Sequence, residues 1–126
     1  MRKFLGLRYV HGGRSLDGVD CWGLVVLVYR ELGVEVEDVN GYEERWSVKG
    51  EERYFDEYKG RWRKVGRDEA QFPDVVLFRN KKGIVYHAGV YLGGGKFLHC
   101  PKVGVVIGRL QDWEDKLDGF YRRRYA

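Results

Sequence analysis

The chain has 126 residues, 23 of them basic and 19 acidic, and 44% of its residues are hydrophobic. This length and balance are typical of one globular domain, expected here over residues 1–126. With 18 glycines, only 2 prolines and 2 cysteines, the composition excludes proline-rich, disordered and disulfide-framework classes.

No segment has the pattern of a membrane span, a signal peptide or a nucleic-acid-binding motif. The longest apolar run, Leu24–Tyr29, is far shorter than a bilayer requires. Residues 1–13 have a basic start but only scattered apolar residues. The uneven net charge of +4 would suit an anionic partner such as nucleic acid or a wall polymer, but a solvated surface is the simpler interpretation. We therefore expect a protein that is made in the cytoplasm without a secretion signal.

The first predicted element is a helix that begins after Asp20 and ends at Gly33. The Asp20 carboxylate can accept hydrogen bonds from the free backbone N–H groups of the first turn, and glycine is a common helix stop. Three valines in this segment are poor helix formers, so the helix depends on burial of an apolar face. That face consists of Leu24, Val25, Leu27, Val28 and Leu32. A strand is the competing local interpretation, but the length and the glycine favour a helix.

A charged middle segment, residues 34–70, separates this helix from a half with the pattern of strands. Within it, Glu51–Lys59 has the pattern of a short amphipathic helix. The predicted strands are Asp74–Arg79, Ile84–Leu92, Lys96–Cys100, Val103–Ile107 and Phe120–Tyr125, with one or two helical turns at Gln111–Leu117. Gly93–Gly95, between two apolar runs, indicates a hairpin. One helix followed by an antiparallel sheet is an α+β domain.

Cys21 is the first residue of the predicted helix. The N-terminus of a helix carries roughly half a unit of positive charge, so we expect a lowered pKa for this thiol. A cysteine nucleophile also needs a base nearby. His87 and His99 lie in consecutive predicted strands, whereas His11 lies in a glycine-rich lead-in where a surface position is the simpler interpretation.

The register of the predicted hairpin decides whether His87 and His99 share a face. A three-residue turn at Leu92–Gly94 places His99 opposite His87, whereas a two-residue turn at Gly93–Gly94 places Cys100 there. The sequence leaves both registers open. In the first, His99 can hydrogen-bond the His87 ring and fix its tautomer.

Each of these residues also has a simpler interpretation. A lone buried cysteine is usually a small hydrophobic residue, and a lone histidine in a strand is usually a satisfied core residue. A zinc site from both cysteines, His87 and His99 is conceivable, but the adjacent His99 and Cys100 lack the spacing by which two ligands converge on one metal. We expect Cys100 to be a buried free thiol, and we expect no metal and no cofactor. Packing in the core or at its edge is the simpler interpretation of Trp46, Trp62 and Trp113.

Two stretches of the chain resemble the NlpC family of cell-wall cysteine peptidases, part of the wider NlpC/P60 superfamily. The segment YVHGGRSLDGVDCWGLV, Tyr9–Val25, resembles the family's cysteine motif. The segments PDVVLFR and HAGVYLGGGKFLHC resemble its second half, and the closing GFYRRR resembles its last strand. Together the motifs span nearly the whole chain, although residues 34–70 match only loosely.

The resemblance implies a papain-like α+β core, with the nucleophile helix packed on a central antiparallel sheet. It implies an endopeptidase or amidase acting on peptidoglycan stem peptides, often at the bond between D-γ-glutamate and a diamino acid. Cys21 would be the nucleophile, His87 the general base and His99 the residue that orients His87. Tyr9 would bind substrate or steady the oxyanion, the Cys21 backbone N–H would be an oxyanion donor, and Asp20 would hold the amino end of the substrate.

Trp22 stands where many wall-lytic members of the family have serine, and DCWG resembles the branch found in phage tail proteins. The resemblance therefore implies an indole that alters the substrate pocket, and a virion tail component with other tail proteins as partners. Two alternatives stay open: a structural tail or assembly module that cleaves no wall, and a different Cys-His amidase reaction. A scaffold has no physical need for an intact set of Cys21, His87 and His99, which argues against the first.

Overall fold

The computed structural model describes residues 1–38 and 61–124. Three short elements come first in the chain: η1, Arg2–Phe4; β1, Arg14–Ser15; and β2, Gly18–Val19. β1 and β2 form a small antiparallel pair of their own. The expected helix at Glu51–Lys59 and Trp46 lie outside the described residues.

The helix predicted after Asp20 is α1, Cys21–Glu31. Asp20 Oδ1 accepts a hydrogen bond of 2.8 Å from the backbone N–H of Gly23, which confirms the N-cap. At the other end Gly33 has a φ of +83°, the left-handed conformation in which helices commonly terminate. The valines of α1 are buried, as a helix of poor helix formers requires. Within the described ranges, no helix has the length and apolar character needed to cross a bilayer.

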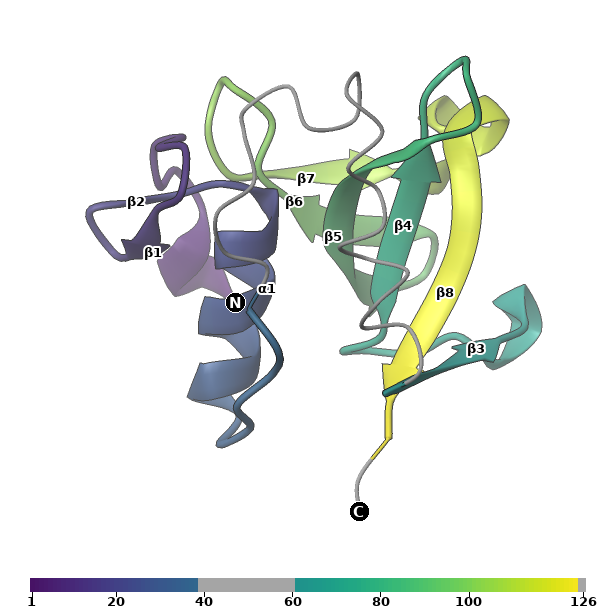
Figure 1. Cartoon of the computed structure of the whole chain (residues 1–126), viewed down its shortest axis with the longest axis horizontal. Coiled ribbons are helices and arrows are strands. Elements are labelled where there is room, and N and C mark those ends of the chain that lie inside the picture. Colours follow the sequence, from purple (N-terminus) through teal and green to yellow (C-terminus); the bar gives the residue numbers. More distant parts are fainter. Residues whose placement is uncertain (39–60, 125–126) are drawn as a thin grey trace.

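Six strands form one antiparallel sheet in the order β3-β8-β4-β5-β6-β7 (Figure 1). The strands are β3, Trp62–Val65; β4, Val75–Arg79; β5, Val85–Gly93; β6, Lys96–His99; β7, Val106–Arg109; and β8, Leu117–Arg123. The connections contain the short 3-10 helices η2, Arg67–Glu69; η3, Leu110–Asp112; and η4, Glu114–Lys116. α1 packs against β5. The predicted α+β architecture, one helix on an antiparallel sheet, is confirmed.

Three strands lie where the sequence predicts them, and the others differ. β4, β5 and β6 match their predicted ranges within one residue at each end. The strand predicted at Val103–Ile107 is wrong: the Gly104 N–H closes a turn on the Pro101 carbonyl at 2.9 Å, and β7 begins only at Val106. The predicted helical turns are η3 and η4, and the last strand starts earlier than predicted, at Leu117.

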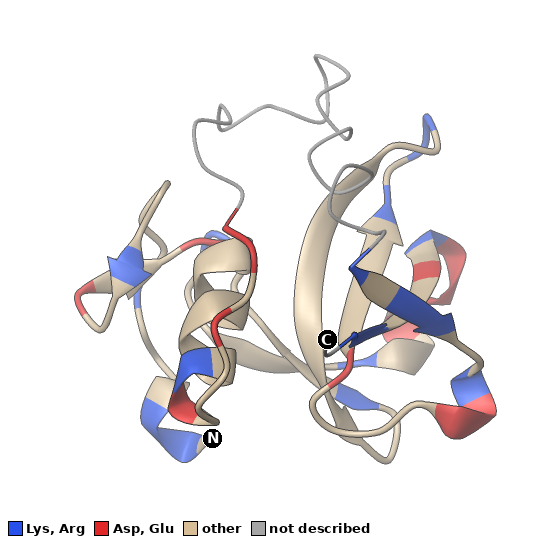
Figure 2. Ribbon diagram, turned by 60° about the horizontal axis from the view of Figure 1, so that its bottom comes forward, with Lys and Arg blue, Asp and Glu red and all other residues tan. Residues whose placement is uncertain are grey.

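No pattern in the sequence predicts β3. Its exposed middle residues, Arg63 and Lys64, lie between the buried Trp62 and Val65, so buried and exposed positions do not alternate. The strand forms through its pairing with β8, in which Trp62 lies opposite Arg123. Its basic side chains mark one edge of the sheet (Figure 2).

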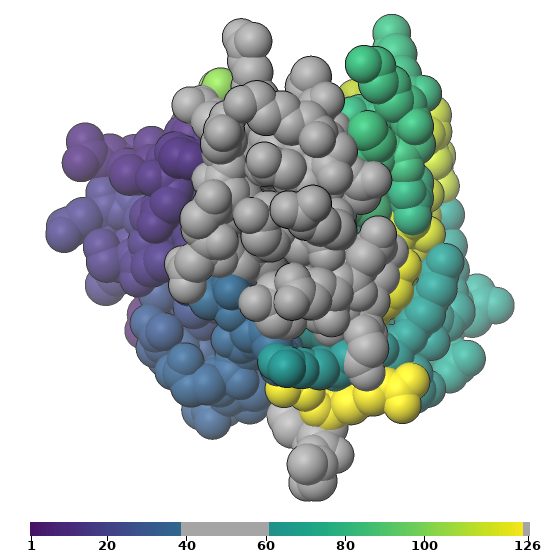
Figure 3. All heavy atoms as spheres, in the orientation of Figure 1, coloured from purple at the N-terminus to yellow at the C-terminus, as the bar shows by residue number. Residues whose placement is uncertain are grey.

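Alternation along the strands divides the core between the two faces of the sheet. The cluster that includes α1 contains Leu77, Ala88, Val90 and Leu98. The second cluster contains Val76, Phe78, Phe97, Leu110 and Phe120. Since His87 precedes Ala88 and His99 follows Leu98, both histidines lie on the second face. The N-terminal segment and α1 form one flank of the molecule, and β3, β4 and β8 form the opposite flank (Figure 3).

A hydrogen bond ties α1 to the start of β4. The Tyr29 hydroxyl donates to the carbonyl of Pro73, and the Tyr29 ring packs edge-on against Trp62, with 5.7 Å between ring centroids. Replacing Tyr29 with Phe keeps the ring and removes only the donor. We expect the free energy of unfolding to fall by about 1 kcal/mol. Urea denaturation with an unchanged m-value would measure this loss, and an unchanged midpoint would contradict it.

Candidate active site

The hairpin of β5 and β6 adopts neither of the two predicted registers. Gly89 lies opposite His99 and Gly93 lies opposite Lys96, so the turn is formed by Gly94 and Gly95. His87 and Gly89 point to the same face of β5, so His99 is a diagonal neighbour of His87. The two imidazoles meet across this diagonal, with 2.8 Å between His87 Nε2 and His99 Nδ1.

Two glycines make room for the His99 ring. A Cβ at Gly89 would lie 3.2 Å from the Cβ of His99 and 2.8 Å from the Leu98 carbonyl. A Cβ at Gly108, on the other neighbouring strand, would lie only 2.9 Å from His99 Nε2. The imidazole therefore lies between two strands that present no side chain where it needs space.

Cys21 and His87 line one cavity of about 260 Å³, although they come from different elements. Cys21 is the first residue of α1, and the backbone of Ala88, the residue after His87, is near enough to act on the pKa of its thiol. Tyr9, Asp20 and other residues complete the lining. The structure thus brings together Cys21, His87 and His99, which the sequence singled out.

Burial, rather than the helix N-terminus, dominates the electrostatics of the Cys21 thiol. Removal from water raises the pKa of Cys21 to about 12, and the Asp20 carboxylate acts in the same direction. The Ala88 backbone opposes this rise. The expectation of a lowered pKa is therefore wrong, and Cys21 is a neutral thiol near pH 7.

The two histidines are also neutral in the folded protein. Burial lowers the pKa of His87 to about 3, with smaller contributions in the same direction from His99 and from the Lys116 ammonium. Burial lowers the pKa of His99 to about 4. Because His87 Nε2 is engaged with His99, Nδ1 is the nitrogen that can accept a proton from a thiol. The site therefore holds a neutral thiol and a neutral imidazole near pH 7, and the lone pair of His87 Nδ1 is the acceptor for a proton.

Asp20 is held by three donors from the protein itself. Oδ1 accepts from the backbone N–H of Gly23 and from Arg14 Nη1, both at 2.8 Å, and Oδ2 accepts from the backbone N–H of Gly12 at 2.8 Å. Arg14 in turn donates through Nε to Asp38 Oδ1 at 2.9 Å. Asp20 therefore builds the N-terminus of α1 and the lead-in loop, and its contact with the amino end of a substrate stays a prediction.

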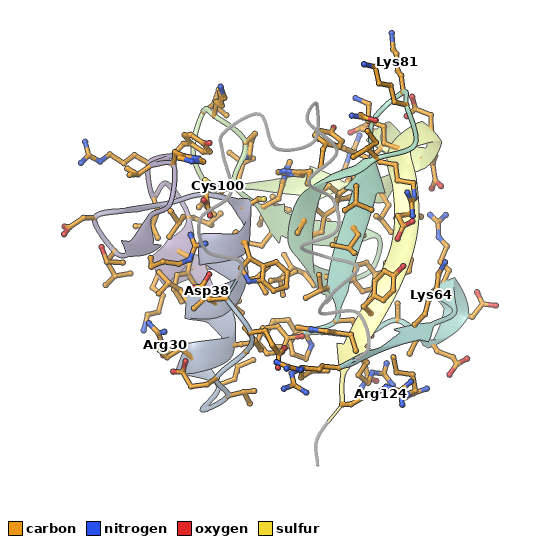
Figure 4. The ribbon with its side chains drawn as sticks, viewed as in Figure 1. Arg30, Asp38, Lys64, Lys81, Cys100 and Arg124 are labelled. Atoms are coloured by element: carbon orange, nitrogen blue, oxygen red, sulfur yellow. The ribbon has the colours of Figure 1, made fainter. Side chains whose placement is uncertain are left out.

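The other predicted residues divide between the cavity and the core. Tyr9 and the exposed His11 line the cavity. Cys100 is a buried free thiol, as predicted, and it also lines the cavity. Its Sγ donates to the Val19 carbonyl at 3.3 Å, near the N-terminal end of α1 (Figure 4). Trp22 is buried and is not among the described residues that line the cavity.

Trp22 instead anchors the chain that follows the helix. Its Nε1–H donates to the Glu37 carbonyl at 2.8 Å, and its ring packs edge-on against Trp62 at 6.0 Å. The structure places the indole between the Glu37 carbonyl and Trp62, and its effect on the substrate pocket stays a prediction.

Two aromatic residues of the cavity were not predicted from the sequence. Trp113 stacks on His87, with 5.6 Å between ring centroids and 18° between ring planes. Tyr86 lines the cavity at a β-bulge: Phe78 pairs with His87 and Arg79 with Val85, which leaves Tyr86 unpaired. Bulges re-aim side chains in this way. The spacing of the cysteine and histidine motifs contains no signal for either residue.

The zinc alternative finds no support within residues 1–38 and 61–124. In these ranges, no group of three or more His, Cys, Asp or Glu side chains could hold a metal ion. The adjacent His99 and Cys100 lie in different surroundings, because His99 meets His87 whereas the Cys100 thiol contacts Val19.

Comparison with known proteins finds one family and several relatives. The profile of the NlpC/P60 family matches residues 6–122. The γ-D-glutamyl-L-lysine dipeptidyl-peptidase of Bacillus subtilis is 33% identical over 106 residues, which are 82% of this chain and 31% of that protein. The γ-DL-glutamyl hydrolase of the same organism is 35% identical over an alignment of 127 positions that covers 95% of this chain and 27% of that protein. The chain thus spans less than a third of either relative.

Solved structures share the fold. A lipoprotein-like protein of the NLP/P60 family from Staphylococcus aureus superposes with a TM-score of 0.72 at 27% sequence identity. The match covers 98% of this chain and 39% of the other.

Proposed function

The chain belongs to the NlpC/P60 family, and on this premise we propose that it is a cysteine endopeptidase or amidase that hydrolyses amide bonds in peptidoglycan stem peptides. Members of the family are peptidoglycan hydrolases. The observation that carries the proposal is the single cavity lined by Cys21 and His87, with His99 at 2.8 Å behind the His87 ring. This is the order of nucleophile, base and orienting group that acyl transfer requires.

The reaction follows from the neutral resting site. His87 Nδ1 takes the proton of the Cys21 thiol as Sγ attacks the amide carbonyl, so that a tetrahedral oxyanion and an imidazolium form together. The C–N bond then breaks, and His87 gives its proton to the leaving amine. A water molecule, deprotonated by His87, hydrolyses the thioester and regenerates the Cys21 thiol with a carboxylate product.

The groups around the nucleophile fit these charges. The Cys21 backbone N–H belongs to the first turn of α1. The N–H groups of a first turn have no carbonyl partner within their own helix, so they stabilise a negative charge placed beside them. It would serve as a donor to the oxyanion, with the Tyr9 side chain in the same cavity. His99 Nδ1 would accept a hydrogen bond from the Nε2–H of His87 and so keep His87 Nδ1 unprotonated for the thiol.

The bond that we propose is the amide between D-γ-glutamate and a diamino acid. Two relatives that are at least 33% identical support this choice, since their names specify γ-D-glutamyl-L-lysine and γ-DL-glutamyl bonds. We also propose that the protein works as a phage or prophage tail component together with other tail proteins. The support for this setting is the DCWG segment, which resembles the tail-associated branch of the family.

One observation favours the alternative of a structural tail module with little or no wall-cleaving activity. Burial that raises the pKa of Cys21 to about 12 makes the thiol a poor nucleophile unless His87 removes its proton during the attack. A different Cys-His amidase reaction would use the same groups on another substrate.

The test is digestion of purified muropeptides that contain the γ-D-glutamyl-diamino acid bond, with products identified by mass spectrometry. We expect a new amine on the diamino acid and a free γ-carboxylate on D-glutamate, with no cleavage by Cys21→Ala. Cleavage of a different amide bond would exclude the proposed bond but keep the enzyme. No cleavage of muropeptides or whole walls by the wild type would favour the structural module.

A further inference from the structure

A single indole contacts both histidines of the site. The Trp113 ring is stacked on His87, with 18° between the planes, and meets His99 edge-on, with 5.2 Å between centroids and 87° between the planes. The other rings near His87 are oblique: Phe78 and Tyr86 lie at 35° and 36°. Trp113 is therefore the ring among these neighbours that lies nearly parallel to the imidazole.

The indole is held firmly, by a part of the chain outside the histidine hairpin. Trp113 lies between η3 and η4. Its backbone N–H donates to the Leu110 carbonyl, and its backbone carbonyl accepts from the Lys116 N–H, both at 2.9 Å. Phe78 packs against the ring at 4.9 Å between centroids, and Lys116 Nζ lies 5.1 Å from the ring centroid. These contacts place the half-buried indole against His87.

We propose that Trp113 is the positioning residue of the His87 base, an inference that rests on the function proposed above. The terminal torsion of a histidine side chain is broad, so the ring plane must be set by its surroundings. One orientation puts Nε2 on His99 Nδ1 and leaves Nδ1 for the Cys21 thiol. A flat indole parallel to the imidazole favours that plane.

The same surface suits the charge that His87 carries during the reaction. An imidazolium on the face of an indole is stabilised by the π electrons, yet the indole face accepts no strong hydrogen bond that would hold the proton in place. The titratable groups around His87 are the Cys21 thiol, His99, the Tyr86 hydroxyl and the Lys116 ammonium.

The test compares Trp113→Leu and Trp113→Phe with Trp62→Phe. Trp62 is a buried tryptophan that packs on Trp22 and Tyr29, away from the histidines, and it is the matched control. We expect Trp113→Leu to lower kcat on a stem peptide about tenfold while KM changes by less than about twofold. Trp113→Phe, which keeps an aromatic face, should recover most of the rate. A loss as large in Trp62→Phe would overturn the proposal.

A second readout needs no substrate and therefore separates this proposal from the proposed function. Alkylation of Cys21 by iodoacetamide, mapped to its peptide, should slow about tenfold in Trp113→Leu. In a His87→Ala background the same substitution should have no further effect, because Trp113 acts through His87. A further tenfold loss there would indicate general disruption and contradict the proposal. These results hold their meaning even if the wild type cleaves no muropeptide.

Should Trp113→Leu fail to fold, proton NMR of the intact wild type carries the test. A stacked indole shifts the ring protons of His87 upfield through its ring current, and Trp113→Phe should reduce that shift. His87 ring protons at the same position in both proteins would overturn the proposal.

Discussion

Replacing His87 with Ala is expected to lower the turnover of a stem-peptide substrate by roughly 1,000-fold or more. Because burial raises the pKa of Cys21 to about 12, almost no Cys21 is a thiolate at pH 7 unless a base removes the proton during attack. His87 is neutral and lines the same cavity, so it can supply that step. Initial rates, together with iodoacetamide alkylation of Cys21, measure the effect.

His99, the residue paired with His87, provides a control with a smaller expected effect. His99→Ala leaves His87 in place but removes the group at 2.8 Å that fixes its tautomer, so we expect a smaller loss, on the order of tenfold to 100-fold. Both variants should keep the wild-type circular dichroism spectrum. A His87→Ala protein with more than a tenth of the wild-type rate would show that the base is another group.

The free energy of unfolding is expected to fall steeply as the pH drops from about 6.5 toward 4. Burial lowers the pKa of His87 to about 3 and that of His99 to about 4, whereas in the unfolded chain both have the ordinary value near 6.5. Between these values the unfolded state binds more protons than the folded state, so acid favours unfolding. Each histidine contributes up to about 1.4 kcal/mol per pH unit, and the loss levels off as the folded protein takes up its own protons.

Urea denaturation at pH 7, 6, 5 and 4 measures this slope. The double variant His87→Gln, His99→Gln removes both buried imidazoles and should lose most of the slope between pH 6.5 and 5. His11→Gln is the matched control, because His11 is an exposed histidine, and it should follow the wild type. Equal slopes in the wild type and the double variant would mean that carboxylates, not histidines, cause the loss of stability at low pH.

The parts of the site that were predictable are those encoded by short-range signals. Asp20 as N-cap, Cys21 at the first helical position and two histidines in consecutive strands follow from local patterns, and the structure contains all of them. The hairpin register was not predictable for a physical reason. Gly93, Gly94 and Gly95 all have positive φ, so each can form the turn and no local preference selects among them.

Other features depend on contacts between distant parts of the chain. The bulge that turns Tyr86 toward the cavity depends on how β4 pairs with β5, and the stack of Trp113 on His87 depends on the path of η3 and η4. The sign of the shift in the pKa of Cys21 was missed because the helix N-terminus is a local signal, whereas the burial that outweighs it is a property of the whole fold.

The division of the site between a hairpin and a helix has a consequence for folding. His87 and His99 belong to one hairpin and are 12 residues apart, so their contact closes a short loop and is expected to form early. Cys21 lies far upstream, and it reaches the base only when α1 docks against β5, a contact of much greater sequence separation. A partly folded chain is therefore expected to hold the two paired histidines without Cys21 beside them, so the complete site would form only when α1 docks.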